Sequence, residues 1–142
     1  MFGLTLQFLQ DHGYDYTPDT IKTITKAKAY EIYQDCIWTP CHIGDIANDA
    51  IASQVFDITV NSGHTMAVRL LQRSIAALGV PINVDSMWGP QTLKLCNQSP
   101  VVPLNNTLVS MRLQFYNSIV ISNPTQSKYL KGWTARARSY LL

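Results

Sequence analysis

The 142-residue sequence has no uninterrupted apolar run long enough to cross a membrane. Its apolar runs, such as residues 75–78 and 119–121, fall far short of the roughly 20 residues that a transmembrane helix needs. The first residues contain neither a basic leader nor a small-residue cleavage site of the kind that signal peptides carry. We therefore expect a protein without a membrane span that stays in the cytoplasm, and any export would need another route.

Acidic side chains are absent from residues 86–142. All nine acidic residues lie in residues 1–85, where five basic side chains against nine acidic ones leave a net charge of −4. This charge separation has two interpretations. Either the basic part forms a surface that binds a polyanion or an acidic protein, or it faces solvent or the acidic part of its own fold. The six basic residues of the acid-free part are Lys94, Arg112, Lys128, Lys131, Arg136 and Arg138.

The sequence also lacks a metal-binding motif and a recognisable nucleophile. Cys36 and Cys41 have no second cysteine pair, and His42 is not at a typical zinc-ligand spacing. With Cys96 the number of cysteines is odd, which favours free, mostly buried thiols in a reducing compartment. No histidine stands in a serine or cysteine nucleophile context, so we expect no metal and no other cofactor.

Apolar residues recur at helical spacing along nearly the whole chain, which predicts an all-α fold of six or seven helices around a single core. Thr23 or Thr25 is a plausible N-cap for the second helix and Thr65 for the fourth, while Gly79 can end the fourth. Residues 80–86 are expected to form a loop or a short hairpin. The expected helices cover residues 4–12, 26–37, 45–60 and 65–78, a short helix from 90, residues 105 or 106 to 121, and residues 129–140.

Three motifs in the first 63 residues resemble those of one enzyme family. The chain opens with Phe2-Gly3-Leu4-Thr5, residues 25–33 end in a tyrosine and are followed by Trp38, and residues 55–63 read Val-Phe-Asp-Ile-Thr-Val-Asn-Ser-Gly. They resemble, in this order, the Gly-Ile-Thr element, the helix with a Tyr…Trp pair and the Phe-Asp-x-x-Val-Asn-x-Gly signature of the glycoside hydrolase family 108 N-acetylmuramidases.

Four further motifs resemble the peptidoglycan-binding half of the same proteins. Residues 67–73 are similar to its Leu-Gln helix, residues 84–93 to its Asp-Gly-x-x-Gly-Pro-x-Thr loop, and residues 112–116 and 131–136 to its last two elements. The resemblance implies one lysozyme-like helical domain over residues 1–142. Within it, residues 1–63 would be the remnant of a muramidase-like lobe and residues 64–142 a peptidoglycan-binding-like helical lobe.

The family's general acid is a glutamate in a Glu-Gly-Gly motif that precedes the Gly-Ile-Thr element, and this sequence contains no such motif. The sole glutamate, Glu31, lies three residues after Lys28 on a predicted helix, as in an ordinary surface pair. Asp57 is a weak candidate for a replacement acid, because the resemblance implies a supporting role for it. We therefore expect no retained catalytic residue, either because the sequence begins late or because the fold has lost its catalysis.

The resemblance implies a phage or prophage protein in the host cytoplasm that acts on or binds peptidoglycan, without catalysis in this form. Aromatic rings can stack on the faces of sugars, and a carboxylate and an amide four residues apart on a helix share one face. The candidate substrate-binding residues are Tyr33, Trp38, Asp57, Asn61 and Trp88.

The alternative is a non-catalytic interaction protein, such as a phage-encoded inhibitor of a host defence protein or of a nucleic-acid-binding protein. The acid-free part would then meet an acidic partner, or a second copy of the chain would cover an apolar surface. The candidate partner-binding residues are Trp88, Lys128, Lys131, Arg136 and Arg138.

Overall fold

Threonine hydroxyl groups set the starts of the first two α-helices. The computed structural model describes residues 3–142, and these divide between two units, Met1–His42 and Ile43–Leu142, which are described separately below. In the first unit, the Oγ1 atom of Thr5 accepts a hydrogen bond from the backbone N–H of Phe8 and begins α1 (Leu6–Asp11). Thr25 caps Lys28 in the same way and begins α2 (Lys26–Tyr33).

The N-terminal unit also contains a 3₁₀ turn and a π-helical turn, one on each side of α2. A 3₁₀ turn, η1 (Thr20–Thr23), precedes α2, and a π-helical turn, η2 (Gln34–Trp38), continues it. The expected helix over residues 26–37 is thus confirmed, with its last part wound as a π-helix. The unit has its own apolar core, formed by Leu4, Leu9, Ile24, Ala29 and Ile32.

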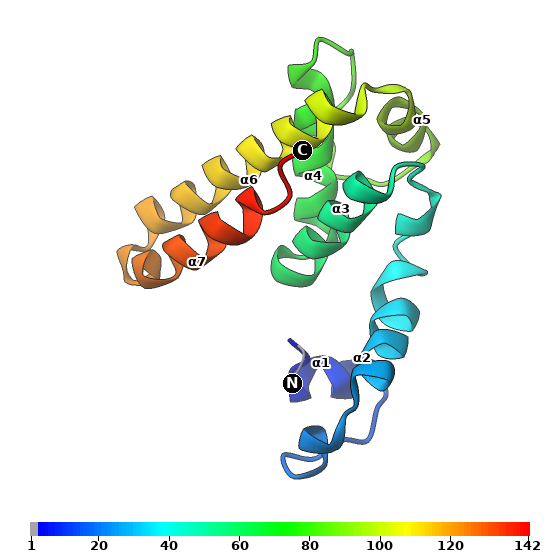
Figure 1. The fold of residues 1–142 in the computed structure, drawn as a ribbon, viewed down its shortest axis with the longest axis vertical. Coiled ribbons are helices and arrows are strands. Elements are labelled where there is room, and N and C mark those ends of the chain that lie inside the picture. Colours follow the sequence, from blue (N-terminus) through cyan, green and yellow to red (C-terminus); the bar gives the residue numbers. More distant parts are fainter. Residues whose placement is uncertain (1–2) are drawn as a thin grey trace. The chain divides into compact units, whose positions relative to one another are not determined.

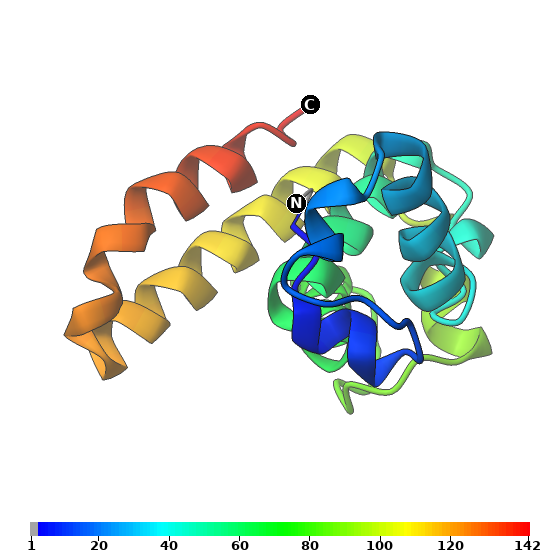
Figure 2. The ribbon, with the colours of Figure 1, turned by 90° about the horizontal axis from the view of Figure 1, so that it is seen from below.

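The C-terminal unit contains five α-helices in chain order. Two of them, α3 and α4, are joined by Gly63, whose φ of 89° is in the left-handed region that favours glycine. Figure 1 shows α6 and α7 running side by side as a hairpin, and Figure 2 shows the same arrangement from below. The elements are η3 (Ile43–Asp45), α3 (Asp49–Ser62), α4 (His64–Ala77), α5 (Pro90–Gln98), α6 (Val101–Ser122), η4 (Pro124–Gln126) and α7 (Ser127–Arg138).

The core of this unit lies where α4 packs against both α3 and α6. Leu71 and Ile75 of α4 and Leu104 and Leu108 of α6 are fully buried there. Burial of a side chain of this size contributes roughly 1.5–3 kcal/mol relative to leaving it in water. The part of the chain that the structure describes contains helices, turns and loops but no strand, which confirms the predicted all-α, lysozyme-like class.

Three predicted helix starts are wrong. Helix α3 begins at Asp49, after its Asn48 cap, instead of residue 45. Helix α4 begins at His64, directly after Gly63, and no side chain caps it, so Thr65 already lies inside the helix. Helix α6 begins at Val101 instead of residue 105 or 106. Pro103 is tolerated in its first turn because the backbone N–H groups there have no partner within the helix.

The predicted lobe boundary after Gly63 differs from the boundary between the two units, which follows His42. Helix α3 packs against α4 and α6, so residues 43–63 lie in the same unit as residues 64–142. The separation into lobes 1–63 and 64–142 stays a prediction. Among the described residues, no helix is both long enough and apolar enough to span a bilayer.

The cysteines provide a direct chemical test of burial. All three are free, and burial raises the pKa of the Cys96 thiol to about 12. We expect iodoacetamide at pH 8 to leave Cys96 unmodified in the folded protein, because the thiolate is the nucleophile and only about one thiol in 10⁴ would be ionised. Cys36 and Cys41 are half-buried, and burial raises their pKa values too, so they should react slowly.

Mass spectrometry of tryptic peptides would measure the modification of each cysteine over time. Labelling in 6 M urea is the matched control, in which all three thiols should react at similar rates. Rapid modification of Cys96 in the folded protein would contradict its placement in the core of the C-terminal unit.

Candidate functional site

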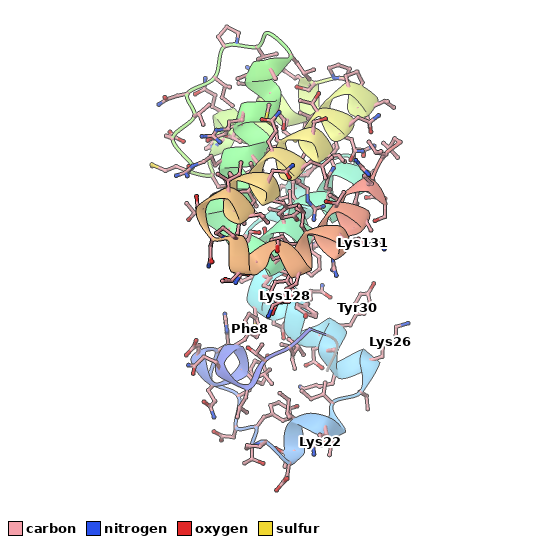
Figure 3. The ribbon with its side chains drawn as sticks, turned by 90° about the vertical axis from the view of Figure 1, so that its left-hand side faces the viewer. Phe8, Lys22, Lys26, Tyr30, Lys128 and Lys131 are labelled. Atoms are coloured by element: carbon pink, nitrogen blue, oxygen red, sulfur yellow. The ribbon has the colours of Figure 1, made fainter. Side chains whose placement is uncertain are left out.

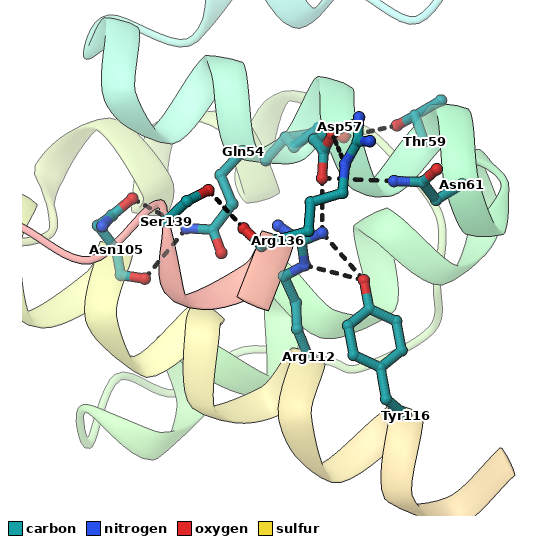
Figure 4. A network of polar contacts seen from close by, with 10 residues as sticks. Gln54, Asp57, Thr59, Asn61, Asn105, Arg112, Tyr116, Arg136 and Ser139 are labelled. Atoms are coloured by element: carbon teal, nitrogen blue, oxygen red, sulfur yellow. Dashed lines mark hydrogen bonds and ion pairs between the residues drawn. The ribbon is translucent and has the colours of Figure 1, made fainter. Parts of the chain in front are cut away.

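A buried carboxylate joins three helices of the C-terminal unit. Asp57 of α3 has only 3% of its side chain exposed. Its Oδ2 atom accepts a hydrogen bond from Nη2 of Arg112 on α6 at 2.6 Å, and its Oδ1 atom accepts one from Nε of Arg136 on α7 at 2.7 Å. Figure 4 shows both guanidinium groups meeting at this one carboxylate. Both carboxylate oxygens are therefore engaged within the protein.

Arg112 is fully buried, and aromatic groups complete its surroundings. Its Nε and Nη2 atoms both donate to the hydroxyl of Tyr116, at 3.2 and 2.9 Å, and its guanidinium carbon lies 5.4 Å from the ring centroid of Tyr140. Such a buried cation is stable only when it is paired and hydrogen-bonded. Asp57, Arg112, Tyr116 and Arg136 are called the Asp57 cluster below.

The charges of the Asp57 cluster do not cancel. One carboxylate stands against two guanidinium groups, so the cluster carries a net charge of +1. The hydrogen bond with Asp57 raises the pKa of Arg136, which keeps this side chain cationic although burial opposes its charge. The side chain of Arg136 is 57% exposed, so the excess positive charge is at the surface.

A pocket of about 360 Å³ opens beside the cluster. Trp133 forms part of its wall, and its ring lies 5.5 Å from that of Tyr116 and 5.7 Å from that of Tyr129, centroid to centroid. The pocket thus combines an aromatic surface with amide, hydroxyl and guanidinium groups. The lining residues are Asn61, Ser62, Tyr116, Ile119, Gly132, Trp133 and Arg136.

A second polar cluster fixes the loop between α4 and α5. The side chain of Gln72, 1% exposed, donates from Nε2 to Oδ1 of Asp85, the carbonyl oxygen of Met87 and Oγ1 of Thr92. Its Oε1 atom accepts from the backbone N–H of Ser86. The bonds from the Met87 N–H and from Gln72 lower the pKa of Asp85. These five residues are called the Gln72 cluster, and they hold residues 85–92 on α4.

The predicted substrate-binding residues lie in three places. Tyr33 and Trp38 belong to the N-terminal unit and are half-buried, and the Tyr33 ring is 6.5 Å from that of Phe8. Asp57 and Asn61 share one face of α3, where Nδ2 of Asn61 donates to Oδ2 of Asp57 at 3.4 Å. Trp88 lies at the other polar cluster, so these residues do not form one site within the C-terminal unit.

Trp88 follows the exposed Met87 in the loop after α4. Its side chain is half-buried, with its ring 6.4 Å from that of His64, centroid to centroid. The role of Trp88 in binding a substrate or a partner stays a prediction.

The predicted basic residues divide between two roles. Lys128, Lys131 and Arg138 are exposed on α7, and Figure 3 labels the first two on that helix. Arg136 belongs to the Asp57 cluster instead. Glu31 is exposed and 3.5 Å from Lys28, which confirms the expected surface pair.

Sequence reasoning missed Arg112, Tyr116 and Trp133 as site residues. A signal existed for the first two, because Arg112 and Tyr116 are four residues apart on a helix and therefore share a face. An arginine that is the one charged residue of a long helix also indicates a buried ion pair, since a buried cation needs a partner. The partner itself could not be read from local sequence.

Two family models match consecutive parts of this chain. Residues 66–138 match the model described as a predicted peptidoglycan domain. The chain belongs to this peptidoglycan domain family. Residues 1–63 match the model of glycosyl hydrolase 108, so the predicted resemblance is confirmed for both parts. The change between the models falls between residues 63 and 66, within the helical unit that contains both α3 and α4.

Solved structures include a similar chain, SagA of Brucella abortus. It is 25% identical in sequence and superposes with a TM-score of 0.76, and the similarity covers 97% of this chain and 74% of SagA. A search of curated proteins gave no match. Together with the family models, the likeness to SagA supports a lysozyme-like, peptidoglycan-associated protein.

Proposed function

We propose that this peptidoglycan domain protein binds peptidoglycan and that its own residues supply no acid for cleaving the glycan. The observation that carries the second part is the environment of its carboxyl groups. All nine lie in the described part of the chain; eight are exposed, and the ninth, Asp57, gives both oxygens to arginines. Glycoside hydrolysis needs a carboxylic acid held protonated in an apolar environment, and none of these groups has one.

The binding part of the proposal rests on the family match over residues 66–138 and on the chemistry of the pocket. Trp133 offers an aromatic surface, and Asn61 and Ser62 offer hydrogen-bonding groups. A concave site with an aromatic wall and a small number of convergent polar groups is typical of binding sites for small ligands. A phage or prophage origin and a cytoplasmic location in the host stay predictions from the sequence.

A sedimentation assay with purified peptidoglycan tests both parts. We expect most of the protein to sediment with the insoluble polymer, and we expect neither loss of turbidity nor new reducing ends in the supernatant. An active muramidase serves as the positive control for cleavage, and insoluble cellulose serves as the control for nonspecific sedimentation. Release of reducing ends by this chain would contradict the absence of a catalytic acid, and protein left in the supernatant would contradict binding.

The exposed basic residues of α7 favour a second candidate, an acidic protein or a nucleic acid as partner. Lys128, Lys131 and Arg138 face solvent, and Tyr129 beside them is 47% exposed. A second copy of the chain is a further candidate occupant of this surface. Light scattering and a filter-binding assay with DNA would separate these cases if the chain does not sediment with peptidoglycan.

A further inference from the structure

We propose that the pocket between α3, α6 and α7 recognises a free carboxylate of a peptidoglycan stem peptide. This inference rests on the proposed function and narrows it, because peptidoglycan offers two chemically different parts. The sugar backbone presents neutral hydroxyl and acetamido groups, whereas the stem peptides present carboxylates. The pocket's charge and hydrogen-bonding groups fit the second part better.

The electrostatic argument begins with the Asp57 cluster. Its net charge of +1 is next to the pocket, and Arg136, which lines the pocket, is more than half exposed. Within the C-terminal unit, the other acidic side chains lie on η3, at the start of α3 and in the loop after α4. An anion in this pocket would therefore be attracted, whereas a neutral sugar would gain nothing from the charge.

The donors in the pocket point to the same ligand. The Tyr116 hydroxyl accepts two N–H groups from Arg112 and keeps its own O–H as a donor on a residue that lines the pocket. Arg136 uses Nε and Nη2 on Asp57, which leaves its Nη1 atom for an incoming oxygen. A carboxylate accepts hydrogen bonds only, and charge-assisted bonds of this kind are the stronger ones.

The remaining wall suits the rest of a peptide. Asn61 directs Nδ2 toward Asp57, which leaves its carbonyl oxygen to accept a peptide N–H. Trp133 and Ile119 provide an apolar surface for an aliphatic side chain. A volume of about 360 Å³ accommodates one or two amino-acid residues and is at the small end of ligand pockets.

Gly132 allows the pocket to be blocked without touching the Asp57 cluster. It lies within α7 and lines the pocket, and a Cβ atom built on it meets no atom within 4 Å. Gly132→Leu therefore adds a side chain to the pocket and also improves helix propensity. Gly132→Ala is the matched control, because it gains the same propensity but adds only a methyl group. Both variants should fold, which thermal unfolding would verify.

The test measures binding of three probes by calorimetry. They are a synthetic stem peptide with free carboxyl groups, the same peptide with its carboxyl groups amidated, and a neutral N-acetylglucosamine disaccharide. We expect the free acid to bind about 10- to 100-fold more tightly than the amide, and we expect the disaccharide to bind weakly. Gly132→Leu should lose binding of the free acid by at least about tenfold, while Gly132→Ala should retain it.

A further variant separates the pocket from general positive charge. Arg138 is exposed on the same helix but does not line the pocket, so Arg138→Gln should bind the free acid nearly as well as the wild type. Equal binding of acid and amide, or full binding by folded Gly132→Leu, would overturn the carboxylate site even if the chain sediments with peptidoglycan. Failure to sediment with peptidoglycan at all would instead refute the proposed function.

Discussion

Asp57→Ala is expected to lower the free energy of unfolding of the C-terminal unit by about 3–5 kcal/mol. The substitution removes the carboxylate that pairs with Arg112, whose side chain is fully buried, and it also releases Arg136. The cost arises mainly from the unpaired buried cation and less from the lost attraction. Because domains of this size are stable by only about 5–15 kcal/mol, the variant would lose a large part of its stability.

Urea unfolding followed by circular dichroism would measure this change. Asn61→Ala is the matched control, because it removes an exposed amide bonded to the same carboxylate at 3.4 Å and should cost under about 1 kcal/mol. The double variant Asp57→Leu with Arg112→Met should recover part of the loss, since replacing both members of a buried ion pair with apolar groups is often nearly neutral. An Asp57→Ala protein as stable as the wild type would contradict the described ion pairs.

Gln72→Ala is expected to cost about 2–3 kcal/mol and to release the loop between α4 and α5. The buried amide of Gln72 has three acceptors within hydrogen-bond distance of Nε2 and accepts one bond at Oε1, whereas a further bond from an α4 side chain to this loop runs from Nε of Arg69 to Oγ of Ser86. A typical hydrogen bond contributes about 1 kcal/mol net, but the released loop groups would regain water. The loss should therefore be below the sum of four bonds.

Hydrogen exchange is the sharpest measurement for this variant. The amide of Ser86, which donates to Gln72, should lose its protection, and Trp88 emission should shift to longer wavelength as the ring becomes more exposed. Arg73→Ala, at an exposed neighbouring position on the same helix, should change neither. Unaltered exchange at Ser86 in Gln72→Ala would show that the loop is held by other contacts.

The helices could be predicted from the sequence because their signals are local. Apolar residues at helical spacing, the Thr25 cap and the Gly79 stop all act within a few residues, and the structure confirms them. The start of α6 differs from the prediction because a proline commonly breaks a helix, whereas Pro103 lies in the first turn of α6. In the first helical turn, the missing N–H of a proline has no cost.

The candidate site could not be predicted in the same way. Asp57 and Asn61 were correctly placed on one helical face, but the arginines that engage Asp57 are 55 and 79 residues away in sequence. Only the packing of α6 and α7 on α3 brings them together. Charge counts indicated an excess of positive charge after residue 85, without showing that two of its six basic residues are used within the fold.

The ion pairs of Asp57 also determine how α7 is aligned along α6. Contacts among Leu113, Leu130 and Trp133 are apolar, and apolar packing alone tolerates a shift along the helix axis. A slip of α7 by one helical turn, about 5.4 Å, would carry Arg136 away from Asp57 and leave the carboxylate with one arginine. The polar contacts therefore select one of several alignments that the apolar contacts would permit, and they keep the walls of the pocket in register.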